Sequence, residues 1–248
     1  MNADGYQEAA PPSVPQKTWL DRLQALFEVL LLAGIVSSVI ATLPFAISAS
    51  GRASLLGNVR AMSVYLLLEV SITFVLLFLV MRAHGETLKG LGLSWERWRF
   101  RVLLGLAIVP ILFFLNAIVS VIFQTLLPQY FLERNPLTEL IRTPQDLILF
   151  VGTALIAGGI KEELQRAFIL RRFQACLGGT RLGLILWSVA FGLGHYVQGA
   201  QGMVVAGAFG LIFGIAYLAR RNLIVPMVAH GTYDTIALVG YWFFASRS

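Results

Sequence analysis

Long stretches of this sequence carry no charged side chain. Residues 29–51, 102–132 and 182–219 contain no Asp, Glu, Lys or Arg. Each stretch matches or exceeds the roughly 20 residues that an α-helix needs to cross a bilayer, and the last is long enough for two crossings. We therefore predict an all-α fold, a polytopic transmembrane helical bundle.

The overall composition agrees with a membrane protein. Of 248 residues, 57% are hydrophobic and 13% are charged, which lies outside the range of soluble domains. The net charge of +6 does not indicate a nucleic-acid partner, because the basic residues sit at the ends of apolar segments. Cys176 is the only cysteine, so an intrachain disulfide is excluded.

Hydropathy divides the chain into about seven passes. We expect a disordered tail over residues 1–18, because this polar stretch lacks the pattern of a signal peptide. Residues 19–146 would hold the first three passes, with an interfacial helix over residues 90–101 that places Trp95 and Trp98 at headgroup depth. Residues 147–245 would form a helical core. The expected passes are residues 26–45, 62–81, 103–126, 147–170, 182–198, 203–219 and 223–244.

Seven passes distribute the basic residues unequally between the two sides of the membrane. The positive-inside rule then places the N-terminus in the cytoplasm and the C-terminus outside, with the plasma (inner) membrane as the expected location. One side receives twelve basic residues, and the other receives five, namely Arg52, Arg60, Arg134, Arg142 and Arg247.

A charged cluster interrupts the fourth predicted pass. It comprises Lys161, Glu162, Glu163 and Arg166, and leaving these groups unpaired at the bilayer centre would cost on the order of 10 kcal/mol. We therefore expect the cluster to face protein or water and to mark a functional site. Further along the chain, His195 follows Phe191, and Asp234 follows His230, at the i,i+4 spacing that shares a helix face.

The three groups are ordered as in a known protein family. Glu162-Glu163 with Arg166, then Phe191 to His195, then His230 to Asp234, resemble the EExxxR, FxxxH and HxxxN/D motifs of the CPBP intramembrane proteases. That family includes the CAAX prenyl endopeptidases and bacteriocin-processing, Abi-like relatives. The resemblance covers residues 147–244 and implies an intramembrane endopeptidase that acts on a membrane-associated or lipidated polypeptide.

One spacing departs from the family pattern. Arg166 follows Glu162 by four residues, where the family places five. If Arg166 is the anchor, Lys161 takes the first Glu position and Glu162 the second; if the Glu pair is the anchor, Arg166 is displaced. Glu162 is retained in either register, so we predict it as the catalytic carboxylate, with Glu163 as second choice.

The resemblance implies roles for the remaining residues. Beside Arg166, Glu162 would act as a base that takes a proton from water. His195 would hold or polarise that water, His230 would stabilise charge on the scissile carbonyl oxygen, and Asp234 would orient His230. An alternative mechanism uses zinc or another divalent metal bound by Glu162, His195 and His230, although nothing in the sequence resembles HExxH.

Two other classes of function stay open. A proton-coupled transporter would use Glu162, Arg166 and the histidines as a relay, but no inverted repeat is visible. A catalytically inactive scaffold or immunity protein of the same family would bind a partner helix in the same groove. Membrane lipid is the expected surrounding in every case, and the sequence does not decide the oligomeric state.

Some residues have a simpler interpretation. Glu69, alone in the second pass, has no motif around it and is left out of the site. Gly207, Gly210 and Gly214 are expected to let helices approach closely. The pair Gly158 and Gly159, just before the charged cluster, is expected to loosen its helix or admit a neighbour.

Overall fold

All regular elements in the described part of the chain are helical. The computed structural model describes residues 17–47 and 49–244, and no strand occurs within these ranges. The predicted all-α class is therefore confirmed. Of the tail predicted to be disordered, residues 1–16 lie outside the described residues.

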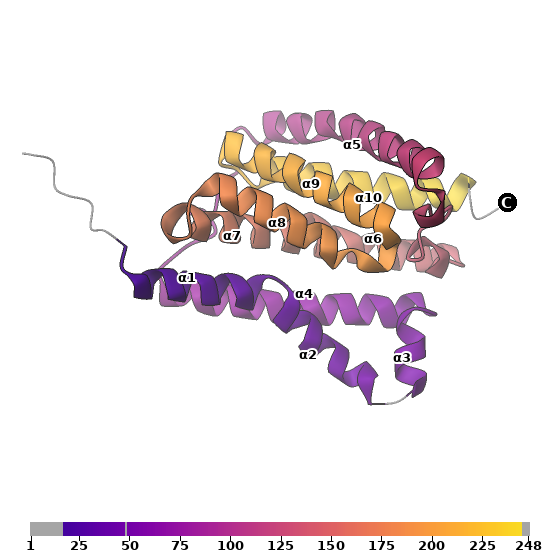
Figure 1. Ribbon diagram of the computed structural model, residues 1–248, viewed down its shortest axis with the longest axis horizontal. Helices are drawn as coiled ribbons and strands as arrows, with labels where there is room; N and C mark the ends of the chain where they lie inside the picture. Colours follow the sequence, from indigo (N-terminus) through magenta and orange to yellow (C-terminus); the bar gives the residue numbers. More distant parts are fainter. Residues whose placement is uncertain (1–16, 48, 245–248) are drawn as a thin grey trace, which may run out of the picture.

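The N-terminal helices form a layer of their own, drawn in indigo and purple in Figure 1. It consists of α1 (Trp19–Leu32), α2 (Ile35–Ala46), α3 (Ala49–Leu55) and α4 (Val59–Ala83). Helix α1 begins with a capping box, in which Thr18 and Asp21 bond each other's backbone N–H. This layer packs on α6 and α7 and on the π-helix between them.

The first predicted pass is not one straight helix. The chain breaks between α1 and α2 at Gly34, whose φ of 96° lies in the left-handed region that only glycine adopts readily. Gln165 of α7 donates a hydrogen bond to the carbonyl of Leu32, which the break leaves without a helical partner. The break therefore lies against the helix that carries the charged cluster.

The remaining helices form the second part of the molecule. Helix α5 (Trp98–Leu126) leads through the short 3₁₀ turns η1 (Pro128–Tyr130) and η2 (Thr138–Leu140) to α6 (Pro144–Ala154). The π-helix η3 (Leu155–Glu162) continues directly from α6 into α7 (Glu163–Cys176). Then follow α8 (Thr180–Gly194), the 3₁₀ turn η4 (Tyr196–Gln198), α9 (Gly199–Arg220) and α10 (Ile224–Phe244).

Small residues allow α8 and α9 to approach closely. A Cβ atom on Gly210 would lie 3.1 Å from the Cα atom of Ser188, and one on Gly207 would lie 3.3 Å from the Ser188 carbonyl oxygen. A Cβ atom on Gly214 would clash with the Leu184 side chain. The packing role predicted for these three glycines is confirmed.

Four helices in the described part are long and apolar enough to cross a membrane. They are the α1–α2 unit over Trp19–Ala46, α4, α5 and the stretch Tyr196–Arg220. Every predicted pass lies mostly in helix. The passes predicted over residues 147–170, 182–198 and 223–244 are not among these four helices, so the count of seven crossings stays a prediction. The apolar helices indicate an integral membrane protein.

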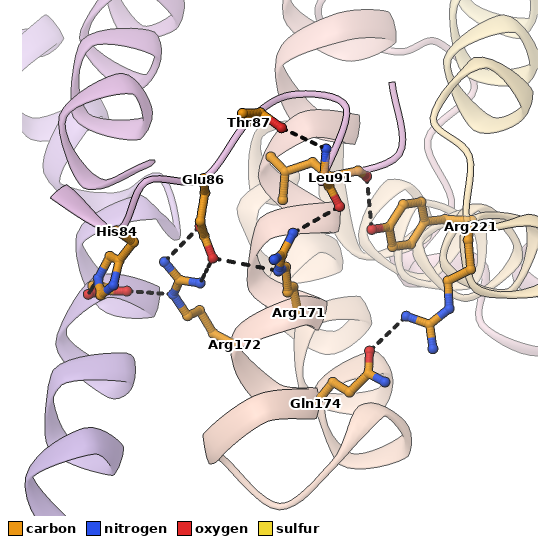
Figure 2. Close-up of polar contacts among 11 residues, drawn as sticks. His84, Glu86, Thr87, Leu91, Arg171, Arg172, Gln174 and Arg221 are labelled. Carbon is orange, nitrogen blue, oxygen red and sulfur yellow. Dashed lines mark hydrogen bonds and ion pairs between the residues drawn. The ribbon is translucent and has the colours of Figure 1, made fainter. Parts of the chain in front are cut away.

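Of the helix predicted over residues 90–101, only residues 98–101 are helical, and the prediction is wrong for residues 90–97. Residues 84–97 form turns, and α5 begins only at Trp98. Gly92, at a φ of 100°, does not suit a helix, and the Gly90 and Gly92 carbonyls accept hydrogen bonds from Arg171 and Asn222. These long-range bonds fix the turns against α7 and the residues after α9. Figure 2 shows the bond from Arg171 to this loop. Trp95 is nevertheless 71% exposed, as an interfacial indole should be.

Candidate active site

The charged cluster lies where the π-helix η3 passes into α7. The wide turns of η3 end at Glu162, and the α-helix resumes at Glu163. Single π-turns inside α-helices occur frequently at functional sites, because they change which side chains face a neighbour. Here the change presents both glutamates toward α10.

Glycines bring η3 and α10 together at this level. A Cβ atom on Gly158 would lie 2.8 Å from Asp234 Oδ2 and 3.2 Å from His230 Nε2. A Cβ atom on Gly159 would lie 3.3 Å from the Cα atom of Gly231. The prediction that this glycine pair admits a neighbouring helix is therefore confirmed.

Glu163 is the buried centre of the cluster. Its side chain is 0% exposed and forms an ion pair with Arg166, which is also fully buried. His230 Nδ1 lies 2.8 Å from Glu163 Oε1, and because a carboxylate only accepts, Nδ1 carries the proton of this hydrogen bond. Glu163 thus fixes the orientation of the His230 ring and leaves its Nε2 facing the other way.

Aromatic rings enclose the Arg166 guanidinium. Its Cζ lies 4.9 Å from the ring centre of Phe191 and 5.3 Å from that of Phe213. The Phe213 ring also stacks on His230, with 4.7 Å between ring centres. A guanidinium over aromatic faces is stabilised by the ring quadrupoles, so Arg166 supports Glu163 from a dry pocket.

Glu162 and Asp234 are the accessible carboxylates. His230 Nε2 lies 3.8 Å from Glu162 Oε2 and 3.6 Å from Asp234 Oδ2. The Glu162 side chain is 19% exposed and that of Asp234 is 27% exposed, whereas Glu163 is sealed. Atoms 3.8 Å apart can both reach one water oxygen placed about 2.8 Å from each. The geometry therefore favours Glu162 over Glu163 as the group that meets water.

Glu69, which the sequence analysis left out of the site, contacts the charged cluster. Its carboxylate, 4% exposed on α4, lies 2.8 Å from Lys161 Nζ and accepts a hydrogen bond of 2.9 Å from Ser37. Lys161 Nζ also lies 3.8 Å from Glu162 Oε1. The signal was present, because a lone carboxylate in an apolar pass requires a partner. The cluster thus extends into the N-terminal layer.

His195 lies apart from the other predicted site residues. Its Nδ1 donates to the carbonyl of Phe191 at 2.7 Å, which leaves Nε2 as the acceptor of the neutral ring. The Phe191 ring centre is 4.6 Å from that of His195 and 6.3 Å from that of His230. Within residues 17–47 and 49–244, no hydrogen bond or ion pair joins His195 to Glu162, Glu163 or His230.

The described residues do not bring three potential metal ligands together. Over the ranges that the structure describes, no three His, Cys, Asp or Glu side chains converge as metal ligands. Glu162 and His230 approach each other, but His195 is turned to its own helix. The zinc hypothesis stays a prediction, and a metal-content measurement on the purified protein tests it.

Comparison with known proteins identifies the segment that carries this cluster. Residues 143–236 match the family model described as Rce1-like, type II CAAX prenyl endopeptidase. This segment is a CPBP-family domain. It contains the predicted residues Glu162, Glu163, Arg166, His195, His230 and Asp234, whereas Glu69 lies outside the CPBP match. No curated protein and no solved structure gives a significant match to the chain.

Proposed function

We propose that this CPBP-family protein is an integral-membrane endopeptidase that hydrolyses a peptide bond with water activated by Glu162. The family match supports a membrane endopeptidase. The observation that carries the finer proposal is the approach of Glu162 and His230 from separate helices, at 3.8 Å. That approach leaves one carboxylate oxygen and one imidazole nitrogen facing the same point.

The proposed reaction follows from the positions of these atoms. Glu162 takes a proton from a water molecule, and the hydroxide adds to the carbonyl carbon of the scissile peptide. His230, with a proton on each ring nitrogen, donates from Nε2 to the carbonyl oxygen and stabilises the negative charge that develops there. Glu162 then passes its proton to the leaving amine nitrogen as the C–N bond breaks, so that atoms and protons balance.

Other residues hold the reacting pair in place. Glu163 bonds His230 Nδ1 and is itself held by Arg166, so it acts as a positioning residue. Asp234 lies beside His230 Nε2 and orients the ring from its open side. His195 Nε2 is the acceptor that remains free to bind water or the substrate backbone.

The proposed substrate is a membrane-associated polypeptide, including lipidated ones. Exposed apolar side chains on the spanning helices would place the domain in lipid, where such a substrate can diffuse to it. We also propose the orientation with a cytoplasmic N-terminus in the plasma membrane. Labelling of a cysteine introduced at Ser94 or at Glu133 from either side of sealed vesicles tests this orientation.

An inactive scaffold is the second candidate. Lys161 occupies the first Glu position of the motif when Arg166 is the anchor, and its charge is bound to Glu69. Purified protein offered a library of membrane peptides separates the candidates. Cleavage that is lost in Glu162→Gln supports the endopeptidase, and tight peptide binding without cleavage supports the scaffold.

A further inference from the structure

A second polar site lies far from the cluster, where α7 and α9 end. A cavity of about 230 Å³ opens there between the loop after α4 and these two helix ends. Its lining contains two guanidinium groups and no carboxylate among the described residues. The lining residues are Gly90, Gly92, Leu170, Arg171, Gln174, Tyr217, Leu218 and Arg221.

Arg221 has no anionic partner in the part of the chain that the structure describes. Its Nη1 donates a hydrogen bond of 2.7 Å to Gln174 Oε1, so the amide nitrogen of Gln174 keeps its own donors. Arg171 donates to the Gly90 carbonyl at 2.8 Å and keeps further N–H groups. Three side chains with spare donors therefore surround the cavity (Figure 2).

The nearby carboxylates belong to another network. Arg172 binds Glu86 through both oxygens, at 2.8 and 3.0 Å, and also binds Glu28 at 2.5 Å. Glu86 Oε1 lies 3.6 Å from Arg171 Nε, a weaker contact, and Glu28 also binds His84 at 2.6 Å. Glu86 thus pairs mainly with Arg172 and only at longer range with Arg171 of the cavity lining, and Arg221 has no carboxylate partner in the described part of the chain.

More positive charge lies on the same surface. A neighbouring hollow shares Gln174 with the first cavity and is lined by Lys17 and Arg22. Asp21, which precedes Arg22 in the sequence, accepts hydrogen bonds from Thr18 in the cap of α1. Cations therefore predominate around Gln174.

Two indoles mark the depth of this surface. The loop that supplies Gly90 and Gly92 continues to Trp95, which is 71% exposed, and to Trp98, which is 48% exposed. Exposed tryptophans of membrane proteins sit at the level of the lipid headgroups. A headgroup phosphate is the anion that this level supplies in quantity, and guanidinium groups bind phosphate through paired N–H donors.

We propose that the cavity between Arg171, Gln174 and Arg221 is a phosphate-binding site that holds the headgroup of an anionic lipid. This proposal is independent of peptide cleavage, because it involves none of the residues of the Glu162 cluster. The ligand chemistry is a phosphate group, which free inorganic phosphate would also supply.

Native mass spectrometry of the detergent-purified full chain tests the site, with phosphatidylglycerol, phosphatidylcholine or inorganic phosphate added. We expect preferential retention of phosphatidylglycerol, weakened about five-fold in Arg221→Gln and about thirty-fold when Arg171→Gln is added. The combined variant Arg60→Gln with Arg142→Gln is the matched control, because both side chains are exposed. Arg60 lies at the start of α4 and Arg142 lies just before α6, whereas the cavity lies near the C-terminal ends of α4 and α7. The single Arg221→Gln variant suffices if the double variant does not fold.

The outcomes separate the two sources of phosphate. Arginine-dependent retention of phosphatidylglycerol supports the lipid site, and arginine-dependent binding of inorganic phosphate alone supports the phosphate chemistry with a soluble ligand. Equal retention by the wild-type protein and Arg221→Gln overturns the proposal. Equal retention of both lipids without phosphate binding also overturns it.

Discussion

Lys161 of η3 and Glu69 of α4 form a buried ion pair, with 2.8 Å between Nζ and Oε2. The pair joins the N-terminal layer, outside the CPBP match, to the helix that carries the cluster. Lys161 Nζ also lies 3.8 Å from Glu162 Oε1. By positioning Lys161, Glu69 of the N-terminal layer therefore influences the position and the electrostatic environment of Glu162, the proposed catalytic carboxylate.

Breaking this pair should destabilise the protein strongly. Glu69→Gln leaves the Lys161 ammonium buried without its counter-ion, for which we expect a loss of about 3–5 kcal/mol in the free energy of unfolding. Replacing both residues by Met should recover most of the loss, because neither member of the pair is then left buried alone. Thermal unfolding in detergent measures both, with the exposed Glu133→Gln as control. An unchanged midpoint in Glu69→Gln would contradict the pairing.

A single methyl group at Gly158 should impair activity without unfolding the bundle. The Cβ atom of Gly158→Ala would lie 2.8 Å from Asp234 Oδ2 and 3.2 Å from His230 Nε2, so the Asp234 and His230 side chains must shift. A displacement near 1 Å at reacting groups can cost about 100-fold in rate. Gly152→Ala, which meets nothing within 4 Å, is the matched control. Equal peptide-cleavage rates in the two variants would contradict the proposed geometry.

Arg166→Lys should be poorly tolerated although the charge is kept. A lysine loses the planar contacts with Phe191 and Phe213 and cannot present the guanidinium fork to Glu163. We expect a loss of about 1–3 kcal/mol in the free energy of unfolding. Chemical denaturation compares it with Arg142→Lys on the exposed surface. Equal stability of the two variants would show that Arg166 is not held as described.

His195→Gln tests whether His195, which has no hydrogen bond to the other site residues in the described part of the chain, takes part in cleavage. If Nε2 of His195 holds water or the substrate backbone, cleavage should fall about 100-fold while the thermal midpoint stays near that of the wild-type protein. Gly194→Ala, with nothing within 4 Å of its new Cβ atom, controls for a local disturbance of the helix end. Unchanged cleavage by His195→Gln would remove His195 from the mechanism.

Much of this arrangement could be predicted from the sequence. The uncharged runs determine the helical class, since lipid requires internally bonded backbone. The i,i+4 spacing of His230 and Asp234 places both on the face that meets η3, where the structure has them. The cost of burying Glu162, Glu163 and Arg166 correctly indicated that they face protein, and Glu163 and Arg166 do so completely.

Other features depended on tertiary contacts that no local pattern reveals. The π-helix decides which glutamate is sealed and which is open, and its wider turn leaves no residue signature at Leu155–Glu162. The partner of Glu69 is 92 positions away in the chain, at Lys161. Trp95 and Trp98 suggested an interfacial helix, but the turns between α4 and α5 are held by bonds to Arg171 and Asn222.

The most direct test of the central claim is a double-mutant cycle on Glu162 and His230, measured as cleavage of a membrane peptide by purified protein. Glu162→Gln and His230→Gln should each lower the rate by about 1,000-fold, and the double variant should lose little more, because the two groups act as one unit. Rate losses that multiply in the double variant, or full cleavage by Glu162→Gln, would contradict the account.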